Sequence, residues 1–413
     1  MSTPLSRRLG PTDAVTIGLG SMIGAGVFAA FAPAAAAAGP GLLLGLAVAA
    51  LVAYCNASSS ARLAALYPQS GGTYVYGRER LGPFWGYLAG WAFVVGKTAS
   101  CAAMAMTVGI YVWPQQAHAV AVSAVAALTV LSCLGVQRSA LLTRVIVAAV
   151  LAVLTAVVVG IAASGSARPL WAQSGDTATV LGVLQAGGLL FFAFAGYARI
   201  ATLGEEVRDP ARTIPRAIRL ALAVTLVVYA AVAVAVMSVL GSGGLAVAHA
   251  PIADAVAAAG LHWLVPAVRA GAALAALGAL LALILGVSRT TLAMARDQHL
   301  PPVLATVHQP SGVPRYAEIA VGTVVAVLAA TVDLRGAIGF SSFGVLVYYA
   351  IANCAALTLG RRMIPVVGLA GCLLLALTLP RAAVLAGAVV LAAGALIYLV
   401  RSRTRRDRRF GAH

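Results

Sequence analysis

Apolar stretches long enough to cross a lipid bilayer recur from one end of this 413-residue chain to the other. A helix of about 20 mostly apolar residues crosses the hydrocarbon core, and short polar segments separate the stretches. The chain is 62% hydrophobic and 9% charged, which is too apolar for a soluble domain of this length. The pattern therefore predicts a membrane protein, and the solvent for most of its surface is the lipid bilayer.

Helix is the only secondary structure that suits these spans, because each one must satisfy its own backbone hydrogen bonds in lipid. The stretches are also too long and too continuously apolar for the strands of a membrane barrel. We expect an all-α fold with twelve transmembrane helices. Their predicted ranges are 13–37, 41–64, 84–112, 117–135, 141–164, 180–203, 214–240, 264–295, 316–333, 337–359, 363–380 and 383–401. Asp209 and Pro210 indicate a turn, and Pro215 is expected to begin the seventh span.

The net charge of +17 would suggest a nucleic-acid partner in a soluble protein. Here the basic residues fall in alternate loops instead. That series comprises Arg7, Arg8, Arg78, Arg80, Arg138, Arg208, Arg212, Arg216, Arg296, Arg315, Arg361, Arg362 and the run 401–409, whereas the other loops carry only Arg168, Arg335 and Arg381. The positive-inside rule then predicts that both termini are cytoplasmic and that the number of spans is even. We expect a multi-pass protein of the cytoplasmic membrane. Its surroundings are the lipid bilayer, and no nucleic-acid partner is expected.

Cysteine and histidine give no sign of catalysis or metal binding. The cysteines lie inside apolar stretches without paired spacing, and the histidines lie outside the span centres. Neither residue type forms a metal or nucleophile constellation with a nearby acid. We therefore expect no metal, no cofactor and no enzymatic activity.

Two spans are interrupted at their centres by glycine or polar residues. The first contains Gly18, Gly20, Ser21, Gly24 and Gly26, and the sixth contains Gly187, Gly188, Gly196 and Arg199. Broken segments at matching positions of two halves indicate a transporter built from inverted repeats, with its binding site where the broken helices meet. The alternative is that these glycines only allow close helix packing.

The two interruptions suit the two charged groups of an amino acid. In the first, the residues Met22, Ile23, Gly24, Ala25 and Gly26 are expected to unwind and offer free backbone N–H groups to a carboxylate. In the sixth, the freed carbonyls around Phe191, Phe192, Ala193, Phe194, Ala195 and Gly196 are expected to accept an ammonium group. The phenylalanine rings either cover the bound ligand or serve only as packing residues. A small zwitterion is the predicted ligand.

Four motifs resemble those of the amino acid, polyamine and organocation (APC) superfamily of transporters. They are GSMIGAGVF (Gly20 to Phe28), YPQSGGTYVYGRERLGPFWGY (Tyr67 to Tyr87), EEVRDPARTIPRAI (Glu205 to Ile218) and SRTTLAMARDQHLPP (Ser288 to Pro302). The resemblance covers the first eight spans in order. It implies a leucine-transporter-like fold with a five-plus-five inverted repeat, discontinuous helices one and six, two additional helices, alternating access and amino acid substrates.

This resemblance divides the chain into segments. They are a cytoplasmic N-terminus (1–12), a first repeat of helices one to five (13–164), a second repeat of helices six to ten (180–359), helices eleven and twelve (363–401) and a basic cytoplasmic tail (402–413). Glu205 and Glu206 face a basic cytoplasmic side, where pairing with Arg289 or another arginine would close an inner gate. The alternative for both acids is an ordinary solvated surface charge.

Lys97 is the only lysine of the chain and lies in the middle of the third span. A charged side chain at this depth is costly and usually marks a functional site. Gly90, Ser100, Cys101 and Met104 share its helical face, which indicates a surface turned to the interior of the bundle. We expect Lys97 to supply proton coupling or to replace the charge of a sodium ion. The alternative is a structural lysine that bonds carbonyls at an unwound helix.

Other positions bear on the coupling ion and on the substrate. Some proton-coupled relatives carry a lysine in the fifth span, where this chain has Val150, and a number carry an acid in the sixth, where it has Ala198. Sodium is therefore a second possibility for the coupling ion. The hydroxyls of Ser288, Thr290 and Thr291 in the eighth span are its candidate ligands, the alternative being that they bond their own backbone, as is usual in membrane helices. All acidic residues fall at span ends or in loops, so a cationic substrate would lack a counter-charge. A neutral or acidic amino acid is expected, with neutral substrates preferred.

These observations together predict a permease for amino acids, acting by alternating access with proton coupling or by exchange. An exporter or antiporter of amino acids or amines is the alternative within transport. A channel or a nutrient-sensing receptor on the same scaffold is the alternative from another class. The sequence is compatible with a monomer or a homodimer.

Overall fold

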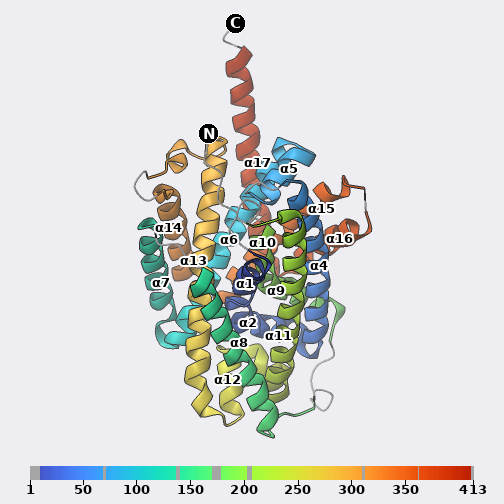
Figure 1. The fold of residues 1–413 in the computed structure, drawn as a ribbon, viewed down its shortest axis with the longest axis vertical. Helices are drawn as coiled ribbons and strands as arrows, with labels where there is room; N and C mark the ends of the chain where they lie inside the picture. Colours follow the sequence, from blue (N-terminus) through green and yellow to red (C-terminus); the bar gives the residue numbers. More distant parts are fainter. Residues whose placement is uncertain are drawn as a thin grey trace.

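The computed structural model describes residues 10–67, 71–135, 140–169, 178–201, 207–308, 312–360 and 362–410. Within these ranges the chain is helical, with one isolated β-bridge between His308 and Val313 and no strand. The helices stand roughly side by side along the long axis of the molecule (Figure 1). This arrangement agrees with an all-α membrane protein.

The first half of the chain supplies the elements α1 to α8. They are α1 (Pro11–Met22), α2 (Ala25–Ala29), α3 (Phe31–Ala38), α4 (Leu42–Leu66), α5 (Thr73–Leu81), α6 (Pro83–Val112), α7 (Ala117–Cys133) and α8 (Ala140–Ala163), with short 3-10 turns η1 (Gly39–Gly41) and η2 (Pro114–Gln116). Helix α5 falls in the polar loop between the second and third predicted spans. The sequence did not reveal it, because its apolar residues do not form a long stretch.

The second half supplies α9 to α17. They are α9 (Val180–Phe194), η4 (Ala195–Tyr197), α10 (Ala198–Ala201), α11 (Pro210–Val247), α12 (Pro251–Ala258), η5 (His262–Leu264), α13 (Val265–Arg296), η6 (Pro302–Ala305), α14 (Arg315–Thr331), α15 (Leu334–Leu357), α16 (Met363–Thr378) and α17 (Arg381–Phe410). The chain bends at Gly241 inside α11, where φ is 70°. Helix α17 continues through the basic segment after residue 401.

Ten candidate membrane spans satisfy both length and hydropathy among the described residues. Helix α16 is a shorter apolar helix of 16 residues, and α14 has 17 residues. The prediction that Pro215 begins the seventh span is wrong, because α11 begins at Pro210 and encloses Pro215. Asp209 stands at the N-cap and Pro210 takes the first helical position, where its missing N–H costs no helical hydrogen bond.

The most buried spans lie at the centre of the bundle. Helix α6 packs against α13 and α15, while α1 packs against α11 and α8, and α9 packs against α4 and α3. Helices α7 and α17 are mostly exposed on the outside, as lipid-facing helices would be. Helix α5 lies at one end of the bundle and α12 at the other (Figure 1). We call these the α5 end and the α12 end.

Candidate functional site

The first predicted interruption is a real break in the helix. Helix α1 ends at Met22, and Ile23 (φ −80°, ψ 51°) and Gly24 (φ −102°, ψ −132°) are not helical. Helix α2 then begins at Ala25. The Ile23 N–H closes α1 by donating to the Leu19 carbonyl over 2.7 Å. The chain therefore crosses the centre of the bundle as two helical pieces.

The second interruption is milder. Helix α9 ends at Phe194, the chain tightens into the 3-10 turn η4, and the short α10 follows. A change from α to 3-10 geometry alters which carbonyls receive intrahelical bonds. Carbonyl groups at this turn are consequently available to other partners.

The two breaks touch each other through their backbones. A Cβ atom added to Gly196 would lie 2.3 Å from the Ser21 carbonyl oxygen, and one added to Gly26 would lie 2.6 Å from the Ala193 Cα. No side chain fits at either contact, because the atoms that it would meet are largely backbone. The glycines predicted to unwind these helices also allow them to meet.

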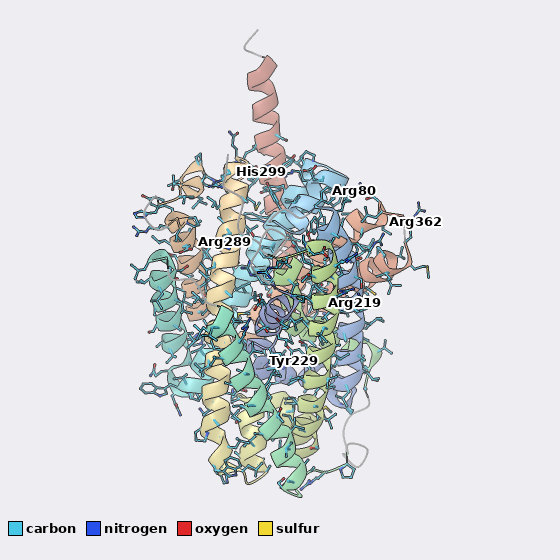
Figure 2. All side chains as sticks on the ribbon, viewed as in Figure 1. Arg80, Arg219, Tyr229, Arg289, His299 and Arg362 are labelled. Carbon is cyan, nitrogen blue, oxygen red and sulfur yellow. The ribbon has the colours of Figure 1, made fainter. Side chains whose placement is uncertain are left out.

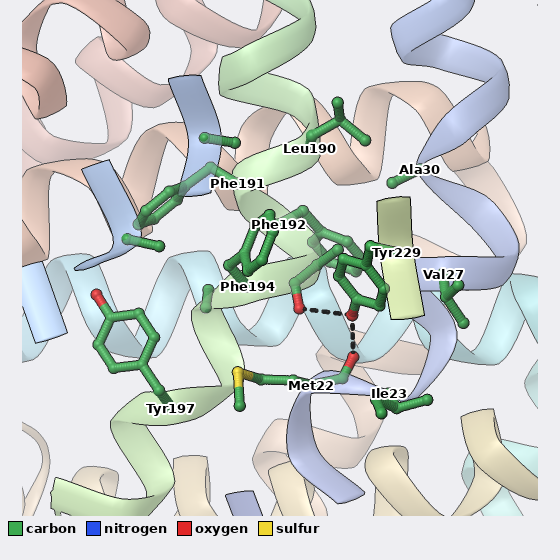
Figure 3. Packing of buried hydrophobic residues seen from close by; sticks show 14 of the residues in the cluster. Met22, Ile23, Val27, Ala30, Leu190, Phe191, Phe192, Phe194, Tyr197 and Tyr229 are labelled. Atoms are coloured by element: carbon green, nitrogen blue, oxygen red, sulfur yellow. Dashed lines mark hydrogen bonds between the residues drawn. The ribbon is translucent and has the colours of Figure 1, made fainter. Parts of the chain in front are cut away.

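Tyr229 on α11 joins the two breaks by its hydroxyl group. The hydroxyl oxygen lies 2.5 Å from the Met22 carbonyl oxygen and 3.0 Å from that of Ala193 (Figure 3). Its one proton is shared between these acceptors, and the side chain is fully buried. Tyr229 therefore satisfies carbonyl groups at the end of α1 and near the end of α9.

A cavity of about 180 Å³ lies beside the second break. Ala195 and Gly196 form part of its wall, and the first break contributes Ser21. Aromatic and aliphatic side chains cover much of the rest, namely Phe93, Met104, Phe192, Leu283 and Tyr348. This is a smaller space than the 300–1,000 Å³ of pockets for drug-sized ligands, so it suits a solute with few heavy atoms.

Lys97 extends from the middle of α6 to the second break. Its side chain is 6% exposed, lines the cavity, and donates a hydrogen bond of 3.3 Å to the Ala195 carbonyl. The neighbouring Ser100 shares a hydrogen bond of 2.5 Å with Ser341 on α15. The predicted interior face of this helix is indeed buried, with Gly90, Cys101 and Met104 also inside. The contact with Ala195 also has the geometry of the structural alternative, a lysine bonding a carbonyl at an unwound helix.

Basic side chains line the cavity. Arg199 and Arg289 line it together with Lys97, and no aspartate or glutamate does so among the residues that the structure describes. Arg289 lies in the upper part of the bundle, toward the α5 end (Figure 2). The cavity therefore offers cationic groups and carbonyl oxygens, but no carboxylate from its described lining, to a ligand.

The α12 side of the breaks is filled by aromatic side chains. The Tyr111 hydroxyl donates to the Phe28 carbonyl over 3.0 Å, and the two rings meet edge to face at 5.6 Å. Phe31 and Phe194 both pack on the ring of Tyr229. All five side chains are buried, so packed rings separate the cavity from the α12 end.

Toward the α5 end, the cavity reaches Gly71 and Tyr74. The Tyr74 hydroxyl donates to the Asp297 carboxylate, which also accepts a bond of 3.0 Å from Arg78. Burial, followed by the Asp297 carboxylate, raises the pKa of Tyr74, so this hydroxyl stays protonated and remains a donor. The Tyr74–Asp297–Arg78 cluster thus fastens α5 to the end of α13 beside the cavity.

The structure separates the predicted ligand-binding residues into two groups. Phe192, Ala195 and Gly196 line the cavity, as do Lys97 and Arg289. The others are buried in the packing around the breaks and do not line it. They are Met22, Ile23, Gly24, Ala25, Gly26, Phe191, Ala193 and Phe194. Glu205 and Glu206 lie outside the described residues.

Of the three hydroxyl groups considered for a sodium site, those of Ser288 and Thr290 are engaged with their own helix, whereas the buried Thr291 hydroxyl has no hydrogen-bond partner among the described residues. Ser288 donates to the Ile284 carbonyl and Thr290 to the Gly286 carbonyl, over 2.8 and 3.1 Å. Such bonds are usual for hydroxyls in membrane helices. Sequence reasoning missed Tyr229 and the Tyr74–Asp297–Arg78 cluster. A single tyrosine in the otherwise aliphatic stretch of α11 was the available signal for Tyr229.

These features define a polytopic membrane protein with two interrupted helices in contact and a small cavity beside them. Residues 13–400 match the amino acid permease family, and the chain belongs to that family. It is a membrane transporter of amino acid permease type.

Similar proteins occur in bacteria and plants. An uncharacterized transporter of Mycobacterium tuberculosis is 71% identical over 403 residues, which cover 96% of this chain and 92% of that protein. The branched-chain amino acid permease BcaP of Bacillus subtilis is 27% identical, covering 97% of this chain and 94% of BcaP. The chloroplastic cationic amino acid transporter 7 of Arabidopsis thaliana is 28% identical, covering 83% of this chain and 63% of that transporter.

Proposed function

We propose that this protein moves amino acids with neutral, apolar side chains across the cytoplasmic membrane by alternating access. The observation that carries the proposal is the small cavity at the second helix break, lined by Lys97 and by apolar side chains. Helix breaks of this kind present backbone groups to the charged ends of a substrate. In this proposal, transport is coupled to protons or proceeds by exchange.

The wall of the cavity supports a neutral substrate. Phe93, Met104 and Leu283 suit an aliphatic side chain, and BcaP, a relative over almost the whole chain, is named for branched-chain amino acids. A cationic side chain would meet Lys97, Arg199 and Arg289 without a described carboxylate to pair with. The plant relatives named for cationic amino acids therefore do not guide the choice of substrate.

We assign the binding site to the backbone from Met22 to Gly26 and to the segment from Phe191 to Gly196. The first would hold the carboxylate and the second the ammonium group, after a conformational change that opens the packed first break. Lys97 is assigned to coupling. Glu205 and Glu206, with Arg289, are assigned to a cytoplasmic gate.

For the architecture we propose twelve spans, with α14 and α16 completing the ten that satisfy the length and hydropathy criteria. The repeats are 13–164 and 180–359, joined to helices eleven and twelve at 363–401, with 1–12 and 402–413 in the cytoplasm. The arginine-rich α5 end faces the cytoplasm in this proposal, because basic loops remain on that side. The cavity then corresponds to an inward-facing state, with the aromatic packing as the closed outer side.

The test is a screen of the purified full-length protein against the L-amino acids by thermal shift, followed by counterflow in proteoliposomes. A ligand that binds the folded form raises its apparent stability. We expect neutral aliphatic amino acids to stabilise the protein and to exchange in a saturable manner. Flux that does not saturate would favour a channel, binding without flux a receptor, and net outward flux against a proton gradient an exporter or antiporter.

A further inference from the structure

The Lys97 ammonium group stands at the place where the substrate's own ammonium group is expected. The proposed site offers carbonyls of the second break to an α-ammonium, and Ala195 supplies such a carbonyl on the cavity wall. The same carbonyl already accepts a hydrogen bond from Lys97. The role inferred below for Lys97 rests on the proposed function, because it concerns how an amino acid enters this cavity.

Two ammonium groups at this carbonyl would repel each other. Lys97 forms no ion pair with any of the described residues, and the described part of the cavity lining contains no carboxylate. A second cation a few ångströms away would be repelled strongly in so buried a setting. Binding of an amino acid at Ala195 is therefore opposed as long as the charged Lys97 side chain stays there.

The Lys97 side chain is able to move away from the Ala195 carbonyl. Lysine carries its charge on a flexible four-carbon chain, and the cavity itself lies beside it. A carboxylate that enters the cavity without an ammonium group of its own would need no such movement. It would meet Lys97 and Arg289 as cationic partners.

We propose that Lys97 is a tethered occupant of the substrate's ammonium subsite and that an amino acid binds by displacing it. Lys97 is then a specificity-determining residue, since it weakens binding of amino acids relative to the matching 2-oxo acids. An occupant that holds the subsite nine-tenths of the time lowers apparent affinity about tenfold. Displacement also couples entry of the substrate to movement of the buried Lys97 ammonium group.

The first experiment measures dissociation constants for matched ligands with the full-length protein in detergent. The probes are L-leucine, L-valine and L-alanine, each paired with its 2-oxo acid, and the readout is the affinity ratio of amino acid to 2-oxo acid. Lys97→Met removes the charge and keeps most of the length of the side chain, and Lys97→Arg keeps the charge. We expect the ratio to rise about tenfold in the Met variant, through tighter binding of the amino acid, and to stay near the wild-type value in the Arg variant. A rise that comes only from weaker binding of the 2-oxo acid would contradict displacement.

The control is Thr98→Val, the next position on α6, whose hydroxyl bonds the Val94 carbonyl and does not line the cavity. An unchanged ratio in a folded Lys97→Met protein would overturn the inference and leave the proposed function intact. Loss of both ligands in that variant would also overturn it, because Lys97 would then hold the carboxylate. Failure of every amino acid to bind the wild-type protein would instead overturn the proposed function.

A second measurement needs no substitution. Because Lys97 is the only lysine, protein labelled with [15N]lysine gives a single Nζ resonance that reports this group. We expect an amino acid ligand to shift that resonance, and the paired 2-oxo acid to shift it much less. Equal shifts with both ligands, or none with a bound amino acid, would show that Lys97 is not displaced.

Discussion

The two helix breaks differ in what surrounds them, although both are made from small residues. At the first, Gly24 packs so tightly on α13 that a Cβ atom would lie 2.7 Å from that of Ala279, and Met22 is held by Tyr229. At the second, Ala195 and Gly196 face a cavity, and the Ala195 carbonyl bonds a charged side chain. One break is closed by packing and the other is open to a small solute.

This difference indicates a division of roles between the breaks. A packed break can act as a hinge, because its backbone is not tied to helical hydrogen bonds. An open break can bind, because its carbonyls and its neighbouring cation are accessible. Alternating access would then require the packed contacts of the first break to loosen while the second holds the substrate.

Substitution of Gly196 should have the largest effect, because this glycine is where the two breaks touch. In Gly196→Ala the new Cβ would lie 2.3 Å from the Ser21 carbonyl oxygen, so the backbones must separate. A displacement of about 1 Å in a site can cost about a hundredfold in activity, and we expect amino acid uptake in proteoliposomes to fall by at least that factor.

The matched control is Gly243→Ala, since a Cβ there has open space within 4 Å. Its uptake and thermal stability should equal those of the wild type. Normal uptake by a folded Gly196→Ala protein would mean that contact between the breaks is not needed for transport.

Removal of the Tyr229 hydroxyl should have the next largest effect, and mainly on stability. In Tyr229→Phe the carbonyls of Met22 and Ala193 lose a donor in a fully buried setting. An unsatisfied buried acceptor costs about 1–3 kcal/mol, so the melting temperature in detergent should fall. Tyr316→Phe, at an exposed position of α14, is the control and should melt like the wild type.

A hinge role for the first break adds a finer expectation. If Tyr229 keeps the break closed, its loss should change the rate of transport more than the affinity for substrate. A change in affinity alone would indicate that Tyr229 helps to form the binding site instead.

Disruption of the Tyr74–Asp297–Arg78 cluster should have a smaller effect, because it lies at the half-exposed α5 end and not at the breaks. Asp297→Asn removes the charge that holds both Tyr74 and Arg78. A partly exposed ionic contact contributes at most about 1 kcal/mol, so uptake should change by no more than about fivefold.

Glu79→Gln is a suitable control for this cluster. Glu79 pairs with the same arginine over 3.1 Å, but both of these residues belong to α5. Equal effects of the two substitutions would mean that only the charge around Arg78 matters and that the link from α5 to α13 does not.

The sequence predicted the parts of this structure that depend on local composition. The apolar stretches indicated the spans, and the glycines near residues 24 and 196 indicated the breaks, because backbone interruptions need residues that tolerate them. Lys97 was singled out because a lysine in the middle of an apolar span is costly in a membrane.

The local sequence could not predict contacts between segments that are far apart in the chain. Nothing around residue 229 shows that its hydroxyl reaches both Met22 and Ala193, and nothing near Ala195 shows that Lys97, 98 positions earlier, bonds its carbonyl. The sequence also could not show that the first break is packed, since that depends on how closely α13 approaches. Helix α5 was likewise not predicted, because it lies in a polar loop and its apolar stretch is short.

Ser21→Ala should have the smallest effect, and it tests whether the first break contributes side chains or only backbone to the site. Ser21 is the one residue of residues 20–26 that lines the cavity, but its hydroxyl donates to the Ile17 carbonyl of its own helix over 2.8 Å. Removing a hydroxyl already engaged in this way should change uptake by less than about twofold. Ser123→Ala, whose hydroxyl makes the same kind of bond at an exposed position of α7, sets the background for such a change. A large loss of affinity in Ser21→Ala alone would show that this hydroxyl contacts the substrate, and the first break would then bind with a side chain as well as move.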